Sequence, residues 1–121
     1  MPLAVFRCDA SLAIGGGHAM RCLTLAGVLR HLGWTCGFAT SAETPATVPS
    51  LAASEFDVAN AAGMLSHWPA ADLLVVDHYG LDASFERAAR PWARRILVID
   101  DLADRRHEAD LLLDQTHGRV Q

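Results

Sequence analysis

The chain has 121 residues, of which 51% are hydrophobic and 20% charged, and its formal net charge is −4 at pH 7. These values predict one globular domain over residues 1–121 and exclude a disordered chain. The acidic balance argues against a nucleic-acid partner, and no apolar run approaches the ~20 residues of a membrane span. With no secretory signal visible either, we expect a cytoplasmic protein.

Three cysteines, Cys8, Cys22 and Cys36, are an odd number without CxxC spacing. This excludes a disulfide framework and predicts small buried thiols in a reducing compartment. All ten basic residues are arginines. The absence of lysine excludes a P-loop and a Schiff-base lysine.

Apolar runs and helical periodicity predict strands that alternate with helices. The run Leu3–Cys8 is too continuous for a half-exposed strand and predicts a strand buried on both faces. Asp82 is placed to cap a helix, and Pro91 to finish or kink it. The expected strands are residues 3–8, 34–40, 56–59, 73–77, 95–100 and 111–113. The expected helices are residues 18–32 and 82 to about 91–93, with shorter ones at 49–54 and 61–67.

The helix over residues 18–32 has a single apolar face, and Gly33 is placed to end it. That face comprises Ala19, Leu23, Ala26, Leu29 and Leu32. Strands that alternate with helices form right-handed βαβ units. The sequence therefore predicts an α/β fold, a Rossmann-like doubly wound parallel sheet.

A glycine loop, Gly15-Gly16-Gly17, joins the first strand to this helix, and His18 follows it directly. Glycines let a ligand approach the main chain, and the N-terminus of the helix favours an anion such as phosphate. The same positive dipole end helps to keep His18 neutral and able to accept a proton. This arrangement suits a general base beside an anion site. The alternative is a tight turn that needs glycine and has no further role.

Arg21 lies in the first turn of that helix, where a cation opposes the helix dipole. Its position indicates an anionic partner, either a ligand phosphate or a carboxylate such as Asp9. Several expected strands also end in polar residues, which in a parallel sheet meet at the ligand crevice. Of these, Asp100, Asp101 and Asp114 are best explained as helix caps. His78 and Tyr79 are candidates to bring two hydrogen-bonding groups to the same crevice as the glycine loop.

Other motifs point to function less directly. The glycine loop fits the dinucleotide fingerprint GxGxxG only in part, because Met20 stands where glycine or alanine would allow close packing. The six histidines show neither HxH nor HExxH spacing, so we expect no metal site. No serine lies in a GxSxG context.

Four blocks of sequence stand out when they are taken together. The first is Arg7-x-Asp9-x-Ser11-x-x-Ile14-Gly15-x-Gly17-His18-x-x-Arg21-Cys22-Leu23-x-Leu25-Ala26. The others are Asp77-His78-Tyr79-Gly80-Leu81, Ile99-Asp100-Asp101-Leu102-Ala103 and Asp110-Leu111-Leu112-Leu113-Asp114-Gln115. In this order the four blocks resemble the UDP-sugar hydrolases of pseudaminic acid biosynthesis, a family related to the GT-B glycosyltransferases.

The resemblance implies that water attacks the anomeric carbon of UDP-2,4-diacetamido-2,4,6-trideoxy-β-L-altropyranose and that UDP leaves. His18 would position and activate the water, Tyr79 would line the pocket, and the glycine loop would lie at the cleft. We add the hypothesis that Asp9 orients His18. The family needs no metal or cofactor for this reaction.

Members of the family have two Rossmann-like domains, and the second holds most of the UDP. The resemblance therefore implies that this chain is the N-terminal half of a GT-B-type fold, without the nucleotide-binding domain, and that it hydrolyses little by itself. Two alternatives stay open: the acceptor domain of a GT-B glycosyltransferase and a non-catalytic sugar- or nucleotide-binding module.

Overall fold

The computed structural model describes residues 2–9, 17–77, 83–99 and 111–113. Six strands are β1 (Leu3–Cys8), β2 (Thr35–Thr40), β3 (Asp57–Asn60), β4 (Ala71–Asp77), β5 (Ala93–Ile99) and β6 (Leu111–Leu113). The helices are α1 (Gly17–His31), α2 (Thr44–Thr47), α3 (Pro49–Ala52), the 3₁₀ turn η1 (Ala61–Gly63), α4 (Met64–His67) and α5 (Ala83–Ala89).

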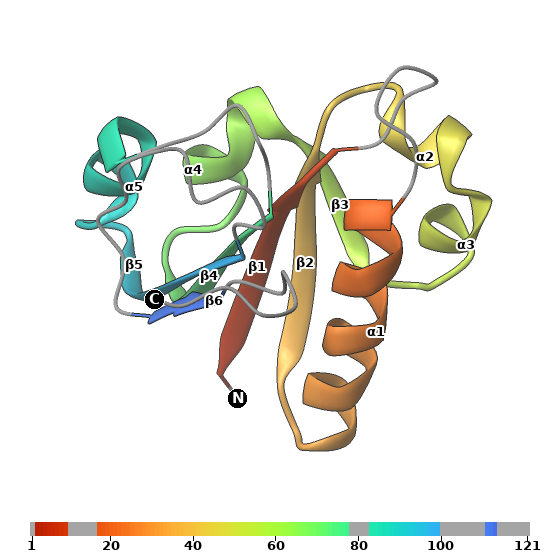
Figure 1. Ribbon diagram of the computed structural model, residues 1–121, viewed down its shortest axis with the longest axis horizontal. Helices are drawn as coiled ribbons and strands as arrows, with labels where there is room; N and C mark the ends of the chain where they lie inside the picture. The colour runs from red at the N-terminus through yellow and green to blue at the C-terminus, as the bar shows by residue number, and fades with distance from the viewer. Residues whose placement is uncertain (1, 10–16, 78–82, 100–110, 114–121) are drawn as a thin grey trace, which may run out of the picture.

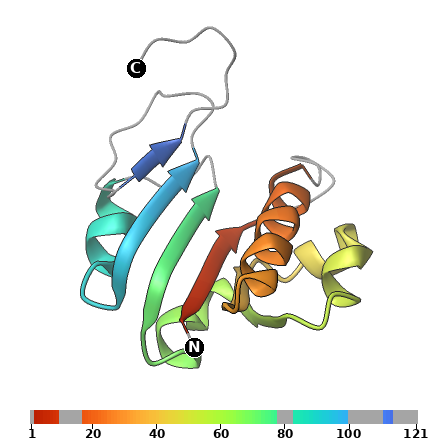
Figure 2. The ribbon, with the colours of Figure 1, turned by 90° about the horizontal axis from the view of Figure 1, so that it is seen from below.

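The six strands form one sheet in the order β3-β2-β1-β4-β5-β6, and every described pairing is parallel. This is the strand order of a Rossmann-like doubly wound sheet, so the predicted fold class is confirmed. Helices α1 to α3 lie on one side of the sheet and α4 and α5 on the other (Figures 1 and 2).

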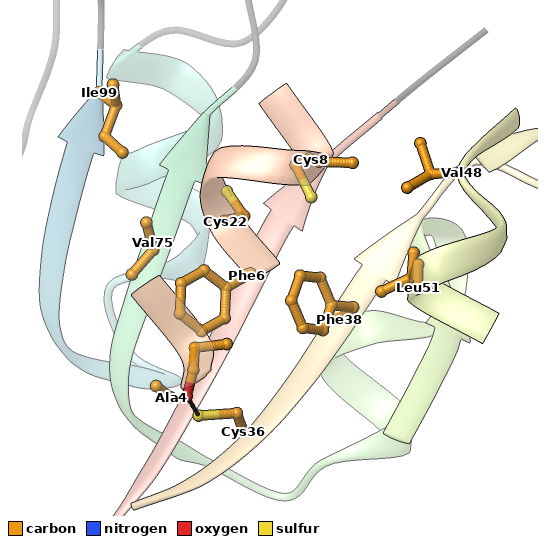
Figure 3. Packing of buried hydrophobic residues seen from close by; sticks show 12 residues of the cluster. Ala4, Phe6, Cys8, Cys22, Cys36, Phe38, Val48, Leu51, Val75 and Ile99 are labelled. Carbon is orange, nitrogen blue, oxygen red and sulfur yellow. Dashed lines mark hydrogen bonds between the residues drawn. The ribbon is translucent and has the colours of Figure 1, made fainter. Parts of the chain in front are cut away.

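Because the strands are covered on both faces, alternate residues of each strand enter two separate cores. In β1, Phe6 faces α1 and stacks on Phe38 of β2 with ring centroids 5.1 Å apart (Figure 3). Its neighbour Val5 belongs to the opposite core, which contains Trp68 and Trp92. All three cysteines are free and buried in the first core, as the sequence predicted.

The apolar face of α1 differs from the prediction at its end. Leu32 is 68% exposed, and Cys22 is fully buried in the core beside Ala19 and Ala26. The helix ends at His31, and Gly33 adopts a φ of +97° while the Trp34 N–H donates to the Leu29 carbonyl. The Leu32 N–H still donates to the Val28 carbonyl at 3.1 Å, so Leu32 keeps the helical register but lies on the side of α1 away from the buried Ala19, Cys22 and Ala26.

The remaining elements match the prediction to within a few residues, with one addition. The predicted loop after β2 contains the helix α2, with Pro45 in its first turn. Helix α5 ends at Ala89, two residues before Pro91, as expected for a residue that cannot continue a helix. The predicted cap Asp82 lies outside the described residues.

The second core is held by two tryptophans and a close approach at Gly37. The indole N–H of Trp92 donates to the Trp68 carbonyl at 2.7 Å, and both rings are buried. A Cβ at Gly37 in β2 would lie 2.5 Å from Cζ2 of Trp68. Glycine at this position therefore lets Trp68 lie directly against the sheet.

Gly37→Ala is expected to lower the free energy of unfolding by about 1–3 kcal/mol, because the added methyl group must displace the Trp68 ring. Gly27→Ala is the matched control, since a Cβ there meets nothing within 4 Å in the middle of α1. It should raise the free energy of unfolding by about 0.5–1 kcal/mol. Urea denaturation of both variants tests the prediction, and equal effects would contradict it.

Candidate functional site

The candidate site lies at the carboxyl edge of the sheet, between β1 and β4. The chain proceeds from β1 to β2 on one side, whereas β4 lies on the other side of β1 and is followed by β5. Doubly wound sheets bind ligands outside the strand ends at such a switch point. Cys8 and Asp77 are register partners at this edge, so β1 and β4 end side by side.

An ion pair joins Arg21 in the first turn of α1 to Asp77 at the end of β4. The Arg21 guanidinium donates through Nε to Oδ2 of Asp77 and through Nη2 to Oδ1 at 2.5 Å. The Asp77 side chain is fully buried, whereas that of Arg21 is 26% exposed. Asp77 therefore provides a carboxylate partner for Arg21, where the sequence had suggested Asp9 as an example. Whether Arg21 also contacts substrate stays a prediction.

Two buried thiols, Cys8 and Cys22, lie next to this ion pair. Cys8 of β1 and Cys22 of α1 lie near each other in the first core (Figure 3), and the Cys22 thiol donates to Oδ2 of Asp77 at 3.8 Å. A hydrogen bond with Cys8, then burial and the nearby Asp77 carboxylate, raise the pKa of Cys22 well above its ordinary value of 9.0. The thiol is therefore a protonated donor and not a nucleophile.

Asp9 ties the ends of β1 and β2 together. Its Oδ1 accepts hydrogen bonds from Nη1 of Arg7 at 2.7 Å and from the backbone N–H of Ser41 at 2.6 Å. Arg7 and Asp9 are each 12% exposed, so this ion pair is largely shielded from water. The hypothesis that Asp9 orients His18 stays a prediction, because the His18 side chain is not among those described.

The structure describes only part of the predicted site. Gly17 is the exposed first residue of α1, and the backbone of His18 follows it in the first turn. The other predicted site residues lie outside the described residues: Gly15, Gly16, His78 and Tyr79.

Sequence reasoning missed two of the contacts at this edge. Asp77 ends an apolar strand and Arg21 opposes a helix dipole, so the sequence marks each residue as unusual. It does not show that the two residues pair, because 56 positions separate them. Nothing in the local sequence marks the Ser41 N–H as a partner of Asp9.

Comparison with models of known protein families gives no match, and comparison with curated proteins gives none either. Among the described residues, no helix is long and apolar enough to span a membrane. Function is therefore inferred from the site itself and from the resemblance in sequence.

Arg21→Ala should lower the free energy of unfolding by about 3–5 kcal/mol, because it leaves the buried Asp77 carboxylate without this partner. Arg94→Ala removes an exposed arginine at the start of β5 and should change stability by less than about 0.5 kcal/mol. Urea denaturation compares the two variants. A loss below about 1 kcal/mol for Arg21→Ala would show that the ion pair adds little to the fold.

Stability should also fall at alkaline pH because of Cys22. An unfolded thiol loses its proton near pH 9.0, whereas the folded protein keeps the Cys22 proton to higher pH. The resulting stabilisation is complete below pH 9.0 and is lost as the pH rises through the pKa of the folded state. Urea denaturation across this range should show a smaller decline for Cys22→Ala than for the unaltered chain. An unchanged decline would exclude Cys22 as the cause.

Proposed function

We propose that this chain is the water-activating domain of a nucleotide-sugar hydrolase. Its substrate would be UDP-2,4-diacetamido-2,4,6-trideoxy-β-L-altropyranose, an intermediate of pseudaminic acid biosynthesis. One observation carries the proposal: Gly17 and the backbone of His18 begin α1, whose first turn meets Asp77 at the switch point of a Rossmann-like sheet. Doubly wound sheets bind their ligands at such a place.

In the proposed reaction, His18 accepts a proton from a water molecule as its oxygen attacks the anomeric carbon. The bond between that carbon and the diphosphate oxygen breaks, and UDP leaves with the bonding electrons. The N-terminus of α1 would keep His18 neutral and would favour the departing negative charge. His78 and Tyr79 would contact the sugar from the end of β4, and Asp9 would orient the base.

The charges at this edge support the proposal that a second domain, and not this one, binds most of the diphosphate. Arg7 pairs with Asp9 and Arg21 with Asp77, so the formal charges of these four side chains sum to zero. A diphosphate needs compensating positive charge, and these paired arginines offer little of it. This agrees with the proposal that a second, nucleotide-binding domain holds most of the UDP. The free thiols fit work in the reducing cytoplasm.

An amide NMR titration of the chain tests the proposal. The UDP-sugar should shift the amide signals of Gly17, His18 and Arg21, whereas UDP alone and NADH should shift them little. Equal shifts with UDP alone would point to a nucleotide-binding module, and shifts with NADH alone to a dinucleotide enzyme.

The same experiment extends to the reaction when the nucleotide-binding domain is supplied. His18→Ala should then lower the rate of UDP release by about 10²–10⁴-fold with little change in affinity, as expected for a lost general base. His31→Ala is the matched control, because it changes an exposed histidine at the other end of α1. A glycoside instead of free sugar as the product would identify a glycosyltransferase acceptor domain.

A further inference from the structure

A row of exposed apolar side chains runs along the outer side of α1 and its C-terminal turn. Four residues spaced four apart form this row, which we call the outer stripe: Met20, Thr24, Val28 and Leu32. Residues four apart lie one above another on a helix. Met20 is 46% exposed, Val28 54% and Leu32 68%, whereas the other side of α1 is buried against the sheet. The helix is therefore apolar on both of its sides.

Thr24 does not interrupt the outer stripe. Its hydroxyl donates to the Met20 carbonyl at 3.2 Å within the same helix, which leaves its methyl group for an apolar contact. Single exposed hydrophobic side chains are ordinary on protein surfaces, whereas a continuous row of them is typical of an interaction site. In the described part of the chain, the remaining exposed large hydrophobic is Leu65 of α4, a helix on the opposite side of the sheet (Figure 1).

The charges beside the outer stripe are already matched within the chain. Arg21 pairs with Asp77, and the Arg30 guanidinium lies 4.4 Å from the ring centroid of Phe56. The stripe itself contains no charged residue. A strongly charged partner would gain no counter-charge from it, whereas a second copy of the chain would present an equally neutral surface. A membrane surface fits less well, because helices that lie on membranes carry many unmatched basic side chains.

The order of side chains along the outer stripe suits pairing with a second copy. In a two-fold symmetric contact, residue i of one copy faces residue j of the other, and j faces i. About an axis between Thr24 and Val28, antiparallel stripes bring Met20 opposite Leu32 of the second copy and Thr24 opposite its Val28. The bulkier side chains then lie at the ends and the β-branched ones at the centre. Rows of residues four apart are also the ridges that pack most commonly between helices.

The size of the outer stripe predicts a weak contact. From Met20 to Leu32 the helix rises about 18 Å, and a helix is about 10 Å wide, so the stripe covers about 180 Å² in projection. Even twice this area falls short of the accessible surface, about 800 Å² on each partner, that a stable interface buries. The stripe therefore fits a dimer that forms with rising concentration and not an obligate one.

We propose that the outer stripe of α1 is a self-association surface, through which two copies of this chain form a weak, two-fold symmetric dimer with antiparallel α1 helices. The expected dissociation constant is about 0.1–1 mM. The inference goes beyond the proposed reaction and does not depend on it, because none of the four stripe residues belongs to the proposed catalytic machinery.

Sedimentation equilibrium and NMR dilution of the full chain test the dimer. Over about 0.05–2 mM, the average mass should rise from that of one chain toward that of two. The amide signals of Met20, Thr24, Val28 and Leu32 should shift over the same range. A mass that stays at one chain throughout, or shifts confined to other elements, would overturn the inference.

Val28→Glu places a carboxylate at the centre of the outer stripe and should weaken association by about tenfold or more. The monomer should keep its fold, because Val28 is exposed and glutamate favours a helix more than valine does. Leu65→Glu is the matched control, since it makes the same kind of change at a side chain that is 48% exposed on α4. It should leave association unchanged, and equal weakening by both variants would argue against the stripe.

A mixing experiment tests the antiparallel arrangement. Thr24→Arg and Val28→Glu should each associate more weakly than the unaltered chain. Their equimolar mixture should associate more tightly than either variant alone, because position 24 of one copy faces position 28 of the other and the introduced charges attract. In a parallel arrangement position 24 would face position 24, and mixing would bring no gain. A mixture without that gain would therefore overturn the antiparallel dimer.

Discussion

The ion pair between Arg21 and Asp77 is the contact on which the geometry of the carboxyl edge depends. A carboxylate that is fully buried at a strand end is costly unless a cation and further hydrogen bonds satisfy it. Arg21 satisfies it from the first turn of α1, so the helix start is held against β4 across the end of β1. The backbone of His18 lies within the same turn, three residues before Arg21.

A second contact extends this constraint to β2. Asp9 accepts from the Ser41 backbone N–H and from Arg7, and thereby joins the ends of β1 and β2. Asp9 thus ties the ends of β1 and β2, and Asp77 ties the end of β4 to α1, at the edge where ligands of doubly wound sheets bind. Rigid support of this kind is what the proposed general base would need.

The two arginines at this edge, Arg7 and Arg21, are each paired with a carboxylate. A guanidinium that is already matched to a carboxylate in two places attracts an additional anion less than an unmatched one does. The residues beyond β2 and β3 present uncharged donors, acceptors and small apolar groups instead. The described residues at this edge therefore suit a neutral ligand better than an anionic one.

The sequence by itself determined the alternation of elements and the parallel fold class, because continuous apolar runs such as Leu3–Cys8 and the period of α1 are local signals. It also placed the glycine motif between a strand and a helix. Only the tertiary structure decided that Arg21 meets Asp77, that Asp9 meets Ser41, and that Leu32 is exposed while Cys22 is buried. Long-range partners depend on strand order and register, and the exposure of Leu32 depends on which side of α1 packs on the sheet, none of which local periodicity encodes.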